Sequence, residues 1–426
     1  MVDLIVVGAG LTGLIAAYTA AKMGQQVKIV TKGLGATHWH AGSIDVLGYY
    51  PDDATPVTRP LETIQDLVRS QPQHPYAILD GTIPDALKNF AALTQEIGLP
   101  YAGAANFGDN LWLPSPVGGA RPTFLAPHAQ LAGDLRRSEP MLIVGLRGMR
   151  DFYPELIAEN LTKQGQRARA AFLPLGLITD RHDINTVQLA YALDDPARRS
   201  KLAAELKKLA QPGERIGLPA LLGIDAHAAA MSDLQTQVGA TIFEIPTLPP
   251  SVPGVRLTNA LRNQLRQLGV RVEINAAVIG FHAEGDRVLW IESDASGRPL
   301  KHRAENFLLA TGGILGGGID SDHTGKVWEV VLNLPLAVPR ERGQWFRARF
   351  FDPAGHPIFR AGVPVHREFQ PIDAQGARVY ANVWAAGNLL AHADPLLERS
   401  LEGIAIATGI AAARNASKQS TVSSEQ

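Results

Sequence analysis

Three glycines near the start of the chain, Gly8, Gly10 and Gly13, constrain its fold more than any other feature of the sequence. They separate an apolar, β-branched run at residues 3–7 from an Ala-rich segment, and a second apolar run follows at residues 27–30. This order predicts a strand, a helix that ends at Gly24, and a second strand parallel to the first. The region is apolar for about the length of a membrane span, but glycines at this spacing favour a strand, a turn and a helix.

Each of the three glycines has a physical reason to lie between a strand and a helix. Gly8 permits a tight turn, Gly10 lets a phosphate approach the backbone, and Gly13 lets the helix pack closely on the strand. The helix N-terminus presents free N–H groups and about half a positive charge to that phosphate. The pattern therefore predicts a nucleotide site, and the alternative is a tight turn without a ligand.

Two later turns indicate which nucleotide is bound. Thr311, Gly312 and Gly313 follow a predicted buried strand, and Gly387 and Asn388 follow another. NAD-binding domains are normally contiguous, whereas here roughly 200 residues interrupt the nucleotide half, so the pattern favours a two-domain flavoprotein. Each turn taken singly is also compatible with an ordinary strand end.

The second strand ends in Thr31 and Lys32, where a dinucleotide-binding fold usually places an acid. That acid accepts hydrogen bonds from the adenosine ribose, and a threonine does so only weakly. Two alternatives follow. Either FAD binds with a weaker contact to its ribose, or the cofactor is FMN, which lacks that ribose.

The remaining sequence predicts an α/β protein with a split Rossmann-like flavin-binding domain and an inserted mixed α/β domain. The flavin-binding domain is expected at residues 1–45, 245–320 and 376–415, and the inserted domain at residues 46–244 and 321–375. Residues 416–426 are polar and are expected to be disordered.

Composition excludes several classes of protein. The sequence has no cysteine, which excludes disulfides and an iron–sulfur cluster held by this chain. Its net charge of −1 is not the strong positive charge that is typical of nucleic-acid-binding proteins. None of the metal-binding motifs sought is found. Since no basic leader precedes the first strand, a cytoplasmic protein is expected.

Several segments resemble one known family. Besides the glycine pattern, they are VTKG at 30–33, AGSIDVLG at 41–48, QHPYAIL at 73–79, IVGLRGMRDF at 143–152, PTLPPSVPGVRL at 246–257, ATGGILGGGI at 310–319 and RGQWFRARFFDP at 342–353. On these motifs, nearly the whole chain resembles the B subunit of the anaerobic glycerol-3-phosphate dehydrogenase.

This resemblance implies a three-part enzyme that oxidises sn-glycerol 3-phosphate to dihydroxyacetone phosphate. Electrons would pass to a quinone through an iron–sulfur partner. The partners implied are an FAD-containing A subunit and an iron–sulfur C subunit, which attaches the complex peripherally to the inner face of the cell membrane. The resemblance implies FMN in the chain itself, with FAD as the alternative. The segment after Asn388 departs from the family, which tends to be glycine-rich there.

The expected cofactor-binding residues lie in the three glycine-containing turns and in the segment that follows the second strand. They are Gly8, Gly10, Gly13, Thr31, Ser43, Thr311, Gly312, Gly313, Gly387 and Asn388. Asn388 has a second expected role, which is to cap the last helix.

Three residues are candidates for catalysis. His38 or His40 can act as a general base on a substrate hydroxyl, and the alternative is a pair of solvated surface histidines. Arg256 can bind a phosphate bidentately or form a structural salt bridge.

Two other functions remain open from the sequence. One is a freestanding FAD oxidoreductase of the succinate dehydrogenase/fumarate reductase type that acts on another small anion. The other is a non-catalytic assembly subunit, which Thr31 and the altered C-terminal segment favour and which would bind no flavin.

Overall fold

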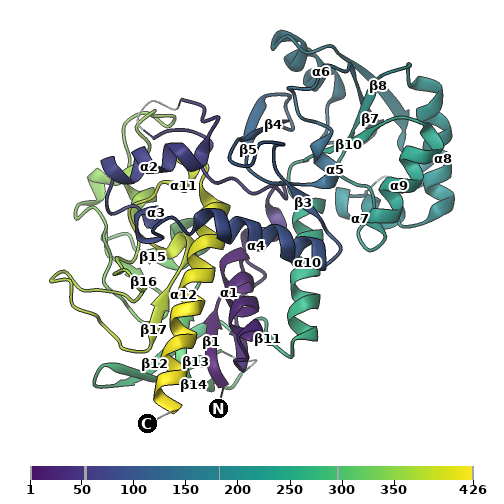
Figure 1. Ribbon diagram of the computed structural model, residues 1–426. Coiled ribbons are helices and arrows are strands. Elements are labelled where there is room, and N and C mark those ends of the chain that lie inside the picture. The colour runs from purple at the N-terminus through teal and green to yellow at the C-terminus, as the bar shows by residue number, and fades with distance from the viewer. Residues whose placement is uncertain (1, 52–54, 182, 295–296, 425–426) are drawn as a thin grey trace. The chain divides into compact units, whose positions relative to one another are not determined.

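The computed structural model describes residues 2–51, 55–181, 183–294 and 297–424, which form two compact units (Figure 1). Unit 1 comprises residues Met1–Ala36, Asp45–Phe90 and Leu261–Gln426, and unit 2 comprises Thr37–Ile44 and Ala91–Ala260.

Unit 1 is built on a mixed sheet. Its described strands run in the order β11-β2-β1-β14-β13-β12, and β17 also pairs with β14. Their bounds are β1 Val2–Val7, β2 Val27–Val30, β11 Arg271–Glu273, β12 Val278–Glu284, β13 Arg287–Ser293, β14 Leu300–Leu309 and β17 Val383–Ala385.

The order of these strands confirms the predicted α/β class and the predicted first βαβ segment. β1 pairs in parallel with both β2 and β14, and β14 pairs in parallel with β17. Helix α1 (Leu11–Lys22) connects β1 to β2, and Gly24 follows it with φ +87°. Strands β12 to β14 form an antiparallel meander. Strand β11 also pairs in parallel with β2, so five described strands run parallel and their carboxyl ends lie at one edge of this sheet.

The long C-terminal helix α12 (Leu401–Ser424) corrects the expectation of a disordered tail. It packs on α1 and β14, beside which it lies in Figure 1. Ala416 and Ser417 are buried, and the Asn306 side-chain amide donates to the Ala416 carbonyl at 3.3 Å. Small side chains let the helix continue against the sheet even though the segment is polar. Residues 425–426 of the predicted tail lie outside the described residues.

Shorter elements complete unit 1. They are η1 Ala36–Trp39, which continues into unit 2, α2 Pro60–Ser70, α3 Pro75–Ile78, α4 Ile83–Glu96, which also continues into unit 2, η3 Ile314–Gly316, β15 Ile319–Ser321, β16 Val327–Glu329, η4 Arg342–Gln344, η5 Pro357–Arg360, η6 Gly387–Leu389 and α11 Pro395–Glu398.

Unit 2 contains a four-stranded parallel sheet in the order β10-β9-β7-β8. The elements of this unit are β3 Tyr101–Ala102, β4 Leu111–Pro114, β5 Ala120–Thr123, β6 Ala126–Pro127, α5 His128–Leu131, β7 Met141–Arg147, α6 Pro154–Lys163, β8 Ala168–Pro174, η2 Leu175–Leu177, α7 Thr186–Ala192, α8 Pro196–Leu209, β9 Arg215–Pro219, α9 His227–Val238, β10 Ile242–Ile245 and α10 Val252–Gln267, which continues into unit 1.

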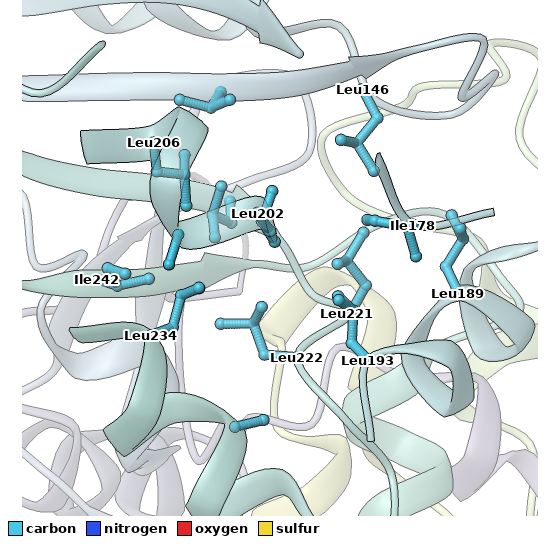
Figure 2. Close-up of a cluster of buried hydrophobic side chains, with 14 of the residues drawn as sticks. Leu146, Ile178, Leu189, Leu193, Leu202, Leu206, Leu221, Leu222, Leu234 and Ile242 are labelled. Carbon is cyan, nitrogen blue, oxygen red and sulfur yellow. The ribbon is translucent and has the colours of Figure 1, made fainter. Parts of the chain in front are cut away.

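The main core of unit 2 lies between its parallel sheet and helices α8 and α9. Leu202 and Leu206 of α8 and Leu234 of α9 are buried there with Ile242 of β10 (Figure 2). Each such side chain contributes about 1.5–3 kcal/mol when fully buried. This core is independent of unit 1, so unit 2 has its own hydrophobic interior.

The two units have different boundaries from the predicted domains. Residues 46–90 and 321–375 belong to unit 1 rather than to an inserted domain, and residues 245–260 belong to unit 2. Backbone contacts explain the first difference, since the Gly48 N–H donates to the Glu398 carbonyl at 2.8 Å. Among the described residues, no helix has both the length and the apolar character that crossing a bilayer requires.

Candidate functional site

Three turns that are far apart in sequence meet at one edge of the unit 1 sheet, where β1, β14 and β17 end. The Ala310 N–H donates to the Val7 carbonyl at 2.8 Å, and the Ala386 N–H donates to the Leu309 carbonyl at 3.0 Å. These bonds extend the parallel pairing past the strands. They bring the three glycine-containing turns of the sequence together.

Glycine is required in two of these turns because the backbones touch. A Cβ atom on Gly8, where φ is +113°, would lie 2.3 Å from the Ala310 carbonyl oxygen. A Cβ atom on Gly313 would lie 2.5 Å from the Asn388 carbonyl oxygen. Both distances are far below van der Waals contact. The turns after β1, β14 and β17 therefore interlock through their main chains.

The same close packing fixes helix α1. A Cβ atom on Gly13 would lie 2.0 Å from the Gly8 carbonyl oxygen, and one on Gly387 would lie 2.2 Å from the Thr12 hydroxyl. The Gly387 N–H donates to the Thr408 hydroxyl of α12 at 2.8 Å. The first turn of α1 is thus held between the turn after β17 and α12.

Gly10 differs from these glycines, because a Cβ atom there would meet no described atom within 4 Å. Its backbone is ordinary, with φ −74° and ψ −179°, and it stands at the N-cap of α1 without a side-chain cap. No acidic residue lies in the first turn of that helix. The space beside Gly10 is therefore open and faces the positive end of α1, which fits a phosphate group.

Two buried polar atoms on the same turns lack a hydrogen-bond partner among the described residues. They are the Thr311 hydroxyl oxygen and the Asn388 side-chain oxygen. Since buried polar atoms are normally paired, an external polar ligand fits these positions. Asn388 lies in η6, well before α12 begins at Leu401, so the expected cap of the last helix is not formed.

Thr31 uses its hydroxyl within its own turn. The hydroxyl donates to the Gly33 carbonyl at 2.6 Å, and the Gly33 N–H lies 3.3 Å from the same oxygen. The Thr31 N–H pairs with the Glu273 carbonyl of β11 at 2.9 Å. These two bonds leave one lone pair on the hydroxyl oxygen.

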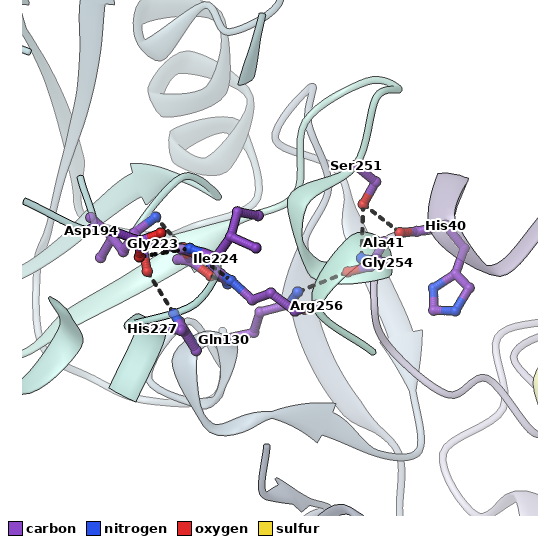
Figure 3. A network of polar contacts seen from close by, with 12 residues as sticks. His40, Ala41, Gln130, Asp194, Gly223, Ile224, His227, Ser251, Gly254 and Arg256 are labelled. Atoms are coloured by element: carbon purple, nitrogen blue, oxygen red, sulfur yellow. Dashed lines mark hydrogen bonds and ion pairs between the residues drawn. The ribbon is translucent and has the colours of Figure 1, made fainter. Parts of the chain in front are cut away.

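In unit 2, residues 37–44 lie against the N-terminus of α10 (Figure 3). The Ser251 hydroxyl donates to the His40 carbonyl at 2.5 Å, and the Gln130 amide donates to the Ala41 carbonyl at 2.8 Å. A Cβ atom on Gly254 would lie 2.5 Å from the Thr37 carbonyl oxygen. The loop that carries both candidate histidines is therefore fixed by backbone contacts.

The two histidines differ in which ring nitrogen is available. The His40 Nδ1 accepts the Gly42 N–H at 2.7 Å, so this atom cannot also take a proton from a substrate. The His38 Nδ1 is buried and has no hydrogen-bond partner among the described residues. Nδ1 of His38 is therefore not engaged by the described residues, whereas Nδ1 of His40 is.

The Ser43 hydroxyl is hydrogen-bonded to a side chain that sequence reasoning did not predict as its partner. This hydroxyl accepts a hydrogen bond from the Arg121 guanidinium at 2.6 Å, and both residues are buried. Arg121 comes from β5, and no spacing in the sequence links it to Ser43. Only the folded hairpin of β4 and β5 reveals the pair.

Arg256 forms the structural salt bridge that was the alternative to phosphate binding. Its two terminal nitrogens lie 2.6 and 2.9 Å from the carboxylate of Glu244, and its Nε donates to the Gly223 carbonyl at 2.7 Å (Figure 3). Both side chains are buried. Burial alone would raise the pKa of Glu244, but the Arg256 charge lowers it. Every nitrogen of this guanidinium is already engaged.

A cluster of buried acids in unit 1 was also missed by sequence reasoning. The Asp45 N–H lies 3.3 Å from the Glu402 carboxylate, and the Asp45 carboxylate pairs with Arg399 at 2.8 Å. Burial, followed by the charge of Asp45, raises the pKa of Glu402 from 4.5 to about 8. The surroundings of Glu402 therefore favour the protonated form of its carboxyl group. Glu402 lies in the C-terminal segment that departs from the resembled family.

The chain matches the family model described as the FAD binding domain over residues 3–400. It is 31% identical to the B subunit of the anaerobic glycerol-3-phosphate dehydrogenase of Yersinia pestis over 418 residues, which are 96% of each chain. It is 30% identical to the protein of that name from Pectobacterium atrosepticum, over 98% of this chain and 99% of the relative.

Solved structures with some likeness to the chain include a 3-ketosteroid Δ1-dehydrogenase from Sterolibacterium denitrificans, with a TM-score of 0.47 and 12% identity over 98% of this chain and 99% of that one. A flavocytochrome c3 fumarate reductase has a TM-score of 0.45 at 11% identity, over 98% of this chain and 78% of that one. Likeness at this level supports no statement about function. Within the described residues, no group of three or more metal-ligating side chains is found.

Proposed function

We propose that this chain, which belongs to the B-subunit family of the anaerobic glycerol-3-phosphate dehydrogenases and contains an FAD binding domain, binds FAD and takes part in the oxidation of sn-glycerol 3-phosphate within a multi-subunit complex. The observation that carries the proposal is the open main chain at Gly10, surrounded by three interlocked glycine turns. When bound, the flavin supplies the redox chemistry.

FAD is proposed over FMN on two grounds. The matching family model is that of an FAD binding domain, and it spans nearly the whole chain. The strand, turn and helix around Gly10 also have the arrangement that binds the pyrophosphate of a dinucleotide. Thr31 then accepts from the adenosine ribose with its one remaining lone pair, in place of the usual carboxylate.

The roles proposed for the other residues follow from their surroundings. Gly8 and Gly13 shape the turn, while Gly10 and the first turn of α1 bind the phosphates. The turns that contain Thr311, Gly312, Gly313, Gly387 and Asn388 contact the rest of the cofactor. His38 is the proposed general base that takes the proton of the substrate hydroxyl.

Electrons must leave this protein through a partner. Oxidation of a secondary alcohol releases two electrons and two protons, and a quinone chain is served through single-electron carriers. The chain has no cysteine with which to hold an iron–sulfur cluster. We therefore propose two partners, which are an FAD-containing A subunit and an iron–sulfur C subunit that attaches the complex to the inner face of the cell membrane.

The test is anaerobic reduction of the purified full-length chain, alone and together with its partner proteins. Bleaching of the visible flavin absorption by glycerol 3-phosphate supports the proposal. Bleaching of the chain alone by a different small anion, and not by glycerol 3-phosphate, would indicate the freestanding oxidoreductase. A colourless chain that binds neither added FAD nor FMN would indicate a non-catalytic assembly role.

A further inference from the structure

Residues 345–358 of unit 1, here called the aromatic loop, expose two phenylalanines almost completely. The side chains of Phe350 and Phe351 are 82% and 90% exposed, and their rings meet edge to face with centroids 4.8 Å apart. Phe346 of the same loop is 58% exposed. Isolated exposed apolar residues are ordinary, but a cluster of this kind indicates a contact surface.

The aromatic loop is held in place by contacts of its own. Trp345 is buried beside Ile358, whose N–H donates to the Trp345 carbonyl at 3.1 Å. The His356 Nδ1 accepts the Arg347 N–H at 3.1 Å, and its Nε2 lies 2.9 Å from the Phe350 carbonyl. A neutral imidazole with its proton on Nε2 satisfies both bonds. The phenylalanines are therefore presented by an ordered backbone.

The surroundings of the aromatic loop are basic. Between residues 340 and 352 the sequence has four arginines and two acids. All four arginines are exposed, as is one acid, Glu341. The other acid, Asp352, is partly buried and lies 3.9 Å from the Arg347 Nε. Positive side chains thus flank an apolar tip, which is the complement of a surface that is anionic outside and apolar beneath.

We propose that the aromatic loop binds anionic phospholipid, with Phe350 and Phe351 at the boundary between headgroups and acyl chains and the arginines on lipid phosphates. Aromatic rings are favoured at that depth, and guanidinium groups bind phosphate bidentately. The loop satisfies several of its backbone groups internally, so it offers a partner its side chains rather than a strand edge. Binding to a lipid surface requires only such side chains and no free backbone groups.

The test is co-sedimentation of the purified full-length chain with vesicles. One set is pure phosphatidylcholine, and the other is phosphatidylcholine and phosphatidylglycerol in equal parts. We expect binding to the anionic vesicles only. Phe350→Ser together with Phe351→Ser should weaken this binding at least tenfold, and Arg340→Gln together with Arg349→Gln should weaken it about fivefold for each charge removed.

Matched controls separate the loop from general surface effects. Tyr153→Ser removes an exposed aromatic ring of unit 2, and Lys201→Gln with Lys207→Gln removes two exposed charges from α8. These variants should bind the anionic vesicles as the unchanged chain does. Equal binding by the loop variants overturns the proposal. A loop variant that binds the anionic vesicles as the unchanged chain does, but no longer co-purifies with a partner protein, also overturns the proposal. The loop would then be a protein interface.

Discussion

Individual glycines near the start of the chain have different purposes. Gly8 and Gly13 are required by the fold, because a side chain on either would collide with backbone. Gly10 is not required by any described contact, yet it stands beside the open end of α1. The sequence motif predicted separate roles for the three positions, and the structure adds the contacts: a Cβ atom would meet backbone at Gly8 and Gly13 but no described atom within 4 Å at Gly10.

Gly10→Val should abolish flavin retention while leaving the fold intact. The added methyl groups would enter open space where the phosphate is proposed to bind, and the backbone angles suit valine. Flavin retention is measured from the visible spectrum and folding from thermal melting. Gly176→Val is the matched control, because a Cβ atom there also meets no described atom within 4 Å, at a distant position of unit 2. A Gly10→Val chain that keeps its flavin would contradict the placement of the phosphate.

Gly13→Ala should lower stability as well as flavin content. Its Cβ atom would need space that the Gly8 carbonyl occupies, so α1 must shift away from the turn. We expect a loss of about 1–3 kcal/mol, the usual range for overpacking. Urea unfolding of the flavin-free protein measures it. An unchanged midpoint would mean that the turn is looser than described.

The buried Glu402 should make stability depend on pH. Its pKa is raised to about 8 in the folded chain from an ordinary value of 4.5, so the folded state holds the proton more tightly. This contribution is fully present below the ordinary pKa and declines as pH rises towards the raised value. Melting temperature should therefore fall between about pH 4.5 and pH 8 and level off above that range, and Glu402→Gln should reduce the fall. Glu62→Gln, on an exposed side chain, is the control and should leave the slope unchanged.

Arg256 should matter for stability rather than for substrate affinity. Arg256→Met leaves the Glu244 carboxylate buried without its partner, which costs about 3–5 kcal/mol. Adding Glu244→Leu removes the unpaired charge and should recover most of that loss. Denaturant unfolding compares the two variants. A raised KM for glycerol 3-phosphate at unchanged stability would instead favour phosphate binding by Arg256.

Whole elements were predictable where the signal is local. The apolar runs and the glycine spacing of residues 3–30 predicted the right strands and helix, because a buried strand and a tight turn each leave a signal in neighbouring residues. The end of α12 was not predictable, since the burial of Ala416 depends on β14, which lies far away in sequence. Asp45 and Arg121 were missed for the same reason, as their partners are contributed by distant segments.

Truncating α12 tests how much its last turns contribute to unit 1. A chain that ends at Arg414 loses the buried Ala416 and Ser417 and the hydrogen bond from Asn306. We expect it to lose about 1–2 kcal/mol and to melt a few degrees lower. A chain that ends at Lys418 keeps these contacts and should melt normally. Equal melting of both would support the sequence-based expectation of a dispensable tail.

At the scale of the whole molecule, the sequence predicted a chain in two parts and the motifs that meet in one of them. It did not predict the boundary between the parts, because residues 46–90 are joined to unit 1 by long-range contacts such as that of Gly48 with Glu398. The names of the relatives supply the substrate class and the setting of a complex that we propose for this chain. The open main chain at Gly10 is the place in this structure where we propose that the flavin phosphate binds.

The most direct test is the visible spectrum of the purified full-length chain, followed by the mass of the flavin released on denaturation. Our account predicts a yellow protein that releases FAD, and a colourless Gly10→Val variant that melts at the same temperature as the flavin-free chain. A chain that is colourless and binds no added flavin, or a variant that retains its flavin, would contradict it.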